Sequence, residues 1–176
     1  RDPEMSRGLG DVYKRQDNIF LDISRFNLHD SIRKTAGALE GVAAKKDIHF
    51  DLELSDTEPL WVSGDKDKIQ QVLHNLMDNA VKFSHEGSSI LISTREKGNR
   101  VFVSVKDSGI GIPKDDLGKI FERFYKTDLS RGKDKLGTGL GLSICKEIIT
   151  AHKQNLDVVS TEGVGSEFVF TLTKET

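Results

Sequence analysis

The sequence is poor in cysteine and proline, and it contains no long apolar run. Its single cysteine, Cys145, cannot form a disulfide within the chain and is typical of a reducing compartment. The apolar runs are far shorter than the roughly 20 residues that a helix needs to cross a bilayer. We therefore expect a cytoplasmic segment without membrane contact of its own. Such a segment can still be the cytoplasmic portion of a larger membrane-bound protein.

The sequence also lacks an excess of either charge. Its 26 basic and 28 acidic residues give a formal net charge of -2, and like charges do not form long runs. This balance favours neither nucleic acid nor an anionic membrane as a partner, so we expect a small ligand at a local site. At 176 residues the chain suits one domain, which would bury roughly two-thirds of the surface of its unfolded form.

Residues 1–16 show no helical or strand periodicity, and we interpret them as a disordered leader or a cloning-derived segment. The domain is expected to span residues 17–176. Short or alternating apolar runs predict strands at residues 26–28, 48–54, 60–62, 90–95, 101–106, 156–160 and 167–172.

Helical periodicity follows the first strand, runs to about Lys46 and places a set of apolar side chains on one face: Ile32, Ala36, Leu39, Val42 and Ala43. A second helix is predicted from the N-cap Asp65 to Phe83, and a third over residues 140–151, while Pro113 begins a short helix. These elements predict an α/β fold, a two-layer sandwich with a mixed, mainly antiparallel sheet of about five strands on about three helices.

The predicted helix from Asp65 carries a polar stripe beside its apolar one. Asn75, Asn79 and Lys82 follow at helical spacing within the segment NLMDNAVKF. Amide oxygens can bind a hard divalent cation, and a lysine can neutralise phosphate. Taken alone, the stripe is more often a solvated helix face.

A carboxylate followed by glycines ends the predicted strand at residues 101–106. Asp107, Gly109 and Gly111 lie in the segment DSGIGI. A buried carboxylate can accept a hydrogen bond from the exocyclic amine of adenine, and glycines let a base lie against the backbone. The alternative for the glycines is a tight turn after an edge strand.

A glycine-rich segment, GTGLGL at residues 137–142, precedes the last predicted helix. Free N–H groups at a helix N-terminus can bind phosphate, although the segment matches neither a P-loop nor a dinucleotide fingerprint. Upstream, the segment FERFY at residues 121–125 supplies aromatic side chains that can anchor a loop on the core. Arg123 and Lys126 are candidate phosphate contacts, with packing and solvated charge as the equally common alternative.

Together, residues 26–173 resemble the ATP-binding catalytic domain of bacterial sensor histidine kinases. Four motifs match in order: residues 75–82 resemble the N box, 107–112 the first glycine box, 121–125 the F box and 137–142 the second glycine box. The segment GVGSEF at residues 163–168 resembles the last glycine-containing turn of that family. The resemblance implies a nucleotide site made by Asn75, Asn79, Lys82, Phe83, Asp107, Gly109, Gly111, Ile112, Arg123, Lys126, Gly137, Thr138, Gly139, Leu140, Gly141 and Ser166.

The same resemblance implies the role of each group. Asn79 would bind Mg²⁺ with Asn75 close by, and Lys82 would contact phosphate, which makes Asn75 and Lys82 the candidate catalytic residues. Phe83 would pack near the nucleotide. Asp107 would bind the adenine amine, and Ser166 would support Asp107 through a water molecule. Residues 126–136 would form a flexible ATP lid, with residues 138–141 as its phosphate-facing hinge.

The chain departs from the family at two positions. After His152, where the family usually has two glycines, the sequence is Lys153-Gln154-Asn155, which leaves the geometry of that turn open. Phe83 replaces a frequent tyrosine, which removes a hydroxyl group but keeps the ring.

The residue type at position 75 helps to distinguish ATP hydrolysis from phosphoryl transfer. Hydrolytic ATPases of the same superfamily have a glutamate there that activates water, and an amide cannot act as that general base. Phosphoryl transfer to another nucleophile is therefore favoured, and the resemblance implies that this nucleophile is a histidine. The chain's own histidines lack the family's acceptor context, so we expect the acceptor on a dimerisation domain of the same protein and a response regulator as an indirect partner. A regulatory ATPase and a nucleotide-binding module without catalysis remain as alternatives.

Overall fold

The computed structural model describes residues 19–122 and 141–176, and no helix there is long and apolar enough to cross a membrane. The predicted leader at residues 1–16 lies outside the described residues. The elements are, in chain order, β1 (Ile23–Asn27), α1 (Leu28–Ala44), β2 (His49–Glu53), β3 (Trp61–Asp65), α2 (Lys66–Phe83), β4 (Ser89–Lys97), β5 (Arg100–Asp107), the 3₁₀ helix η2 (Lys114–Asp116), α4 (Gly141–Ala151), β6 (Leu156–Thr161) and β7 (Gly165–Lys174).

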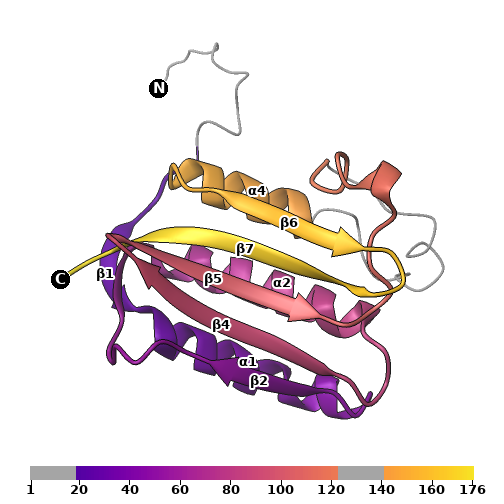
Figure 1. The fold of residues 1–176 in the computed structure, drawn as a ribbon. Coiled ribbons are helices and arrows are strands. Elements are labelled where there is room, and N and C mark those ends of the chain that lie inside the picture. Colours follow the sequence, from indigo (N-terminus) through magenta and orange to yellow (C-terminus); the bar gives the residue numbers. More distant parts are fainter. Residues whose placement is uncertain (1–18, 123–140) are drawn as a thin grey trace.

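The strands pair into one sheet in the order β1-β3-β7-β5-β4-β2, and β6 pairs with β7 beside this path. β2 runs parallel to β4, whereas the other pairs are antiparallel. All seven strand segments expected from the sequence join this sheet, which makes it wider than a sheet of about five strands. Figure 1 shows α1, α2 and α4 together on one face of the sheet. The predicted two-layer α/β sandwich is thus confirmed.

The core lies between the sheet and the three helices. α2 packs between α1 and α4 and buries its predicted apolar stripe completely: Ile69, Val72, Leu73, Leu76, Met77 and Ala80. Alternate residues of β5 and β7 point into this layer: Val101, Val103, Val105, Phe168, Phe170 and Leu172. One predicted core position of α1 was wrong. Val42 is 47% exposed, because the buried stripe passes through Leu39 and Ala43 and leaves Val42 on its solvent side.

The turn after α4 contains a residue with left-handed backbone that is not glycine. This residue is Lys153, with a φ of 61°. Its N–H donates to the Thr150 carbonyl at 2.8 Å, and the Gln154 N–H donates to the Ile149 carbonyl at 3.1 Å. This is the hydrogen-bond pattern of a Schellman motif, in which glycine is usual. The turn after His152 therefore forms without the family's glycines, at the cost of a strained lysine.

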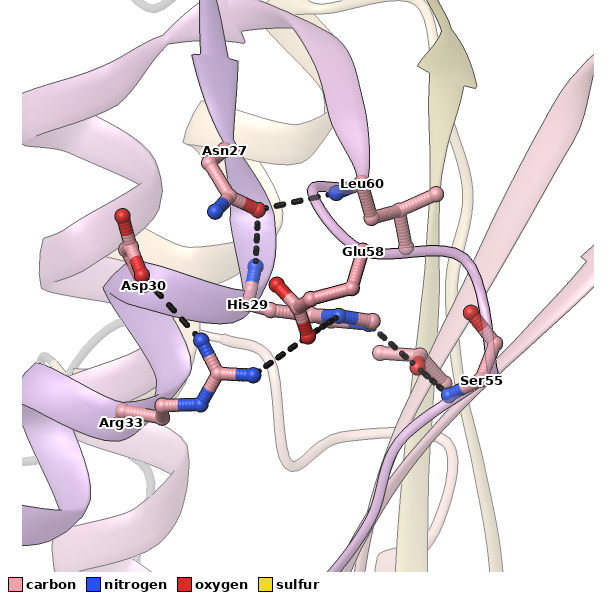
Figure 2. Close-up of polar contacts among 8 residues, drawn as sticks. Asn27, His29, Asp30, Arg33, Ser55, Glu58 and Leu60 are labelled. Carbon is pink, nitrogen blue, oxygen red and sulfur yellow. Dashed lines mark hydrogen bonds and ion pairs between the residues drawn. The ribbon is translucent and has the colours of Figure 1, made fainter.

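Figure 2 shows the polar contacts that fix the start of α1. The Asn27 Oδ1 atom accepts from the His29 N–H at 3.2 Å and from the Leu60 N–H at 3.0 Å. The His29 ring is fully buried, with Nδ1 3.0 Å from Glu58 Oε2 and Nε2 2.9 Å from Thr94 Oγ1. Both ring nitrogens are thus engaged inside the fold. His29 is a structural histidine and is inaccessible to a phosphoryl donor.

Candidate functional site

The polar stripe of α2 is partly exposed beside the buried apolar stripe of the same helix. Asp65 caps the helix, since its Oδ1 atom accepts from the Lys68 N–H at 3.1 Å. Asn75, Asn79 and Lys82 are all half-buried. The Lys82 Nζ atom lies 3.4 Å from Asp78 Oδ2, and this ion pair holds the ammonium group along the helix surface.

Asn75 lies beside the first residue of α4. Its Nδ2 atom is 3.5 Å from the Gly141 carbonyl oxygen, so its amide oxygen is directed away from that contact. Gly141 is the last glycine of the glycine-rich motif. The preceding motif residues Gly137, Thr138, Gly139 and Leu140 lie outside the described residues, as do Arg123 and Lys126. The polar stripe of α2 and the start of α4 are therefore adjacent, as a shared phosphate site requires.

Asp107 is a buried carboxylate at the end of β5, and it is 8% exposed. Its Oδ1 atom accepts from the Gly109 N–H at 2.9 Å and from the Ser166 N–H at 3.3 Å. Within residues 19–122 and 141–176, its Oδ2 atom has no hydrogen-bond donor. Burial raises the pKa of Asp107, while those two N–H groups and the charge of His85 act in the opposite direction. The carboxylate thus keeps one acceptor oxygen for a ligand.

Gly109 joins the Asp107 turn to the end of α2. A Cβ atom at this position would lie 2.0 Å from the Phe83 carbonyl oxygen, which only glycine permits. The next residue, Ile110, donates its N–H to the same oxygen at 3.1 Å. Because Phe83 directly follows Lys82, these contacts bring the lysine of the polar stripe and the buried carboxylate to the same end of the fold.

The turn between β6 and β7 holds the same loop from its other side. Gly111 has a φ of 72°, and a Cβ atom there would lie 2.1 Å from the Thr161 carbonyl oxygen. The Gly163 N–H donates to the Ile110 carbonyl at 2.7 Å, and the Ile112 N–H donates to Ser160 Oγ at 2.8 Å. Residues 109–112 are therefore fixed between α2 and this turn.

Ser166 contacts Asp107 directly through its backbone N–H. Its hydroxyl oxygen lies 2.8 Å from the Ser160 hydroxyl oxygen, and the expected water-mediated contact with Asp107 stays a prediction. Sequence reasoning missed Ser160. The two serines are directly paired across β6 and β7, so the register of that hairpin is the signal that identifies Ser160.

Phe121 anchors the segment that follows η2. Its ring meets the Phe168 ring of β7 edge to face, with centroids 6.3 Å apart, and the Lys146 Nζ atom lies 5.1 Å from the centroid of Phe121. The predicted anchoring on the core is confirmed for this residue. Phe124 and Tyr125 lie outside the described residues.

The donor set fits a nucleotide better than a metal held by acidic side chains. The described part of the chain has no group of three or more His, Cys, Asp or Glu residues arranged to hold a metal ion. It offers instead a buried carboxylate with a spare acceptor, two half-buried amides and a lysine. This combination suits an adenine amine, a cation that keeps much of its own hydration, and phosphate.

Comparison with known proteins gives concordant matches. Residues 64–176 match the family described as histidine kinase-, DNA gyrase B- and HSP90-like ATPase. The sensor histidine kinase WalK of Bacillus subtilis (strain 168) is 45% identical over 127 residues, which cover 71% of this chain and 21% of WalK. The sensor protein SrrB of Staphylococcus aureus (strain NCTC 8325 / PS 47) is 36% identical over 168 residues, which cover 89% of this chain and 29% of SrrB.

Solved structures agree. The catalytic domain of histidine kinase ThkA superposes with a TM-score of 0.76 at 36% identity, and the match covers 87% of this chain and 96% of that domain. ThkA in complex with the response regulator protein TrrA superposes with a TM-score of 0.73 at 34% identity, over 88% of this chain and 42% of that one. The chain spans only 21% to 29% of the two sensor proteins, so it corresponds to one part of them.

Proposed function

We propose that this chain, which belongs to the histidine kinase-, DNA gyrase B- and HSP90-like ATPase family, binds Mg-ATP and transfers its γ-phosphoryl group to a histidine. The chain is a catalytic domain of the histidine kinase type. We place the acceptor histidine on a separate dimerisation domain of the same protein and assign the domain residues 17–176. The response regulator would be an indirect partner, and the segment would lie in the cytoplasm.

The observation that carries this proposal is the buried Asp107 carboxylate, whose Oδ2 atom accepts no hydrogen bond from the described part of the chain. Two backbone N–H groups hold Oδ1, so Oδ2 is oriented and available. A carboxylate accepts from the exocyclic amine of adenine, whereas guanine presents a carbonyl oxygen at the equivalent position and would be repelled. The site is therefore expected to select ATP over GTP.

The phosphate end of the nucleotide would lie along α2. The amide oxygens of Asn79 and Asn75 would bind Mg²⁺, and Lys82 would contact phosphate. When bound, the metal ion would neutralise negative charge on the phosphates. The Lys82 ammonium group would interact both with phosphate and with the Asp78 carboxylate, whose Oδ2 atom lies 3.4 Å from Nζ. Phe83 would pack its ring near the nucleotide.

Asn75 supports phosphoryl transfer over hydrolysis. Its amide takes no proton from water near neutral pH, so it does not activate a water molecule. Instead, an imidazole nitrogen of the dimerisation domain would attack the γ-phosphorus, and ADP would leave. The buried and doubly hydrogen-bonded state of His29 agrees with an acceptor on another domain.

Titration calorimetry with a non-hydrolysable ATP analogue and Mg²⁺ tests nucleotide binding. Asp107→Asn replaces one carboxylate oxygen by an NH₂ group that would face the adenine amine, donor against donor. We expect wild-type binding in about the millimolar range or tighter, at least about tenfold weaker binding by Asp107→Asn, and no change in Asp157→Asn, an exposed control on β6. Equal affinity of the wild type and Asp107→Asn would refute the adenine role.

Radiolabelled ATP tests the transfer. The chain alone should incorporate almost no phosphate, and the matching dimerisation segment should become labelled when it is added. Efficient self-labelling of the chain would contradict an external acceptor. Rapid release of inorganic phosphate that Asn75→Ala abolishes would instead identify a regulatory ATPase, and nucleotide binding with neither reaction would identify a binding module.

A further inference from the structure

The end of α2 has an unusually complete set of hydrogen-bond partners. The last carbonyl groups of a helix have no partner inside the helix and must find one elsewhere. Here the Ala80 carbonyl accepts from the Ser84 hydroxyl at 2.6 Å, and the Phe83 carbonyl accepts from the Ile110 N–H at 3.1 Å. The two carbonyls between them, of Val81 and Lys82, accept from the same side chain, that of Lys46.

Lys46 reaches these carbonyls from the turn after α1. Its Nζ atom lies 2.8 Å from the Val81 oxygen and 3.2 Å from the Lys82 oxygen, and the side chain is half-buried. Its own carbonyl accepts from the Gly87 N–H at 3.1 Å. Lys46 therefore connects the end of α1, the end of α2 and the loop before β4. A cation at the C-terminal end of a helix is also favoured by the helix dipole.

This end of α2 is also the part of the helix that reaches the candidate site. Lys82 and Phe83 occupy its last two positions, and the Phe83 carbonyl is in contact with Gly109 and Ile110 in the Asp107 turn. A rotation of the last turn of α2 would therefore move Lys82 and displace the carbonyl that Ile110 binds. The adenine side and the phosphate side of the site depend on the same helix end.

We infer that Lys46 is a positioning residue for nucleotide binding: its ammonium group fixes the last turn of α2, and with it Lys82 and the Asp107 turn. This inference rests on the proposed function. Lys46 lies 36 residues before Lys82 in the sequence and outside every motif that marked the site. Its contribution would be geometric, since its ammonium group donates to two backbone carbonyl oxygens of α2.

Three variants of the chain test this role. Lys46→Met keeps an unbranched side chain of similar length and removes the ammonium group, whereas Lys46→Arg keeps a cation with several donors. Lys45→Met removes an exposed ammonium group one residue away and serves as the matched control. Titration calorimetry with Mg²⁺ and a non-hydrolysable ATP analogue gives both the dissociation constant and the number of sites. An NMR spectrum reports the amide of Ile110, whose hydrogen bond ends on Phe83.

A positioning role predicts that Lys46→Met raises the dissociation constant about tenfold, with the number of sites near one. The Ile110 amide should shift in this variant, while Lys46→Arg should recover most of the affinity and Lys45→Met should match the wild type. A purely structural role would lower the thermal midpoint and the number of sites and leave the dissociation constant unchanged, which would overturn the inference. If Lys46→Met does not fold, Lys46→Gln is measured with the same expectation.

The same measurements distinguish a failure of the positioning role of Lys46 from a failure of the proposed function. If the wild type binds the analogue and Lys46→Met binds it equally well, the positioning role is wrong and the proposed function stands. If the wild type binds no nucleotide, the proposed function fails first and the positioning role fails with it.

Discussion

Gly109→Ala should both destabilise the fold and disrupt the candidate site. A Cβ atom at this position would lie 2.0 Å from the carbonyl oxygen of Phe83, 2.8 Å from its carbonyl carbon and 3.1 Å from Asp107 Oδ1. Real Cβ atoms essentially never approach another heavy atom within 3.0 Å, so the two backbone segments must separate by roughly 1 Å. Both segments are backbone and neither can rotate away.

The cost follows from what this separation breaks. The hydrogen bond from the Ile110 N–H to the Phe83 carbonyl would be lost, which costs about 1–3 kcal/mol when the groups are buried. Overpacking adds about 1–3 kcal/mol. Together these two terms should lower the free energy of unfolding by about 2–6 kcal/mol. For a chain of this size that lowers the thermal midpoint by roughly 4–24 °C.

Thermal unfolding and analogue titration measure the two effects. Gly37→Ala is the matched control, because nothing lies within 4 Å of a Cβ atom at this exposed position of α1. There the same substitution should stabilise the chain by about 0.5–1 kcal/mol, since alanine favours helix. A Gly109→Ala variant that melts within about 1 °C of the wild type and binds the analogue equally well would refute the reasoning.

Three further predictions concern pH and backbone strain. Because the pKa of Asp107 is raised above the ordinary value of 3.8, this carboxylate becomes protonated at a higher pH than an ordinary aspartate. The affinity for the ATP analogue should therefore begin to fall at that higher pH. Calorimetric titrations across mildly acidic pH measure this. The hydrogen bond from Lys174 to Glu96, together with those from Thr57 and Ser55, lowers the pKa of Glu96 to about 2. Its stabilisation should be complete above the ordinary value of 4.5 and be lost as the pH falls toward 2, and Glu96→Gln should remove that part of the acid dependence of the unfolding midpoint. Lys153→Gly should raise the free energy of unfolding by about 1 kcal/mol in denaturant titrations, because it relieves a φ of 61°.

The bounds of α2 were predicted well because its cap and its apolar stripe can be identified from neighbouring residues in the sequence. Asp65 caps the helix, the apolar stripe continues without a break, and Phe83 ends it as expected. The strand ending at Asp107 followed from the alternation of apolar and polar residues in the same way. Periodicity alone did not settle Val42, because a stripe of helical spacing does not show how wide the buried face is.

The parts of the site that sequence reasoning missed are pairings over long distances in the chain. Ser160 binds the Ile112 N–H across 48 residues, and Lys46 binds the Val81 carbonyl across 35 residues. Neither residue type is unusual in its own segment, so no local pattern marks it. The sequence showed the glycines of the Asp107 turn but not why glycine is needed there. Gly109 is required because the Phe83 carbonyl approaches it closely, and this contact exists only once the sheet and α2 have packed.

α2 is held at both ends by other elements, and this gives its polar stripe a fixed position. At its start, the Asp65 carboxylate accepts from the Asp22 N–H at 2.9 Å, while the Asp65 N–H donates to the His152 ring at 3.0 Å. Burial would raise the pKa of Asp65, yet the N–H groups of Asp22 and Lys68 lower it overall, so the capping carboxylate stays charged. The other end, about 27 Å away, meets the Asp107 turn. The residue that precedes β1 and the Asp107 turn therefore contact opposite ends of α2, and the polar stripe lies on the helix between these two contacts.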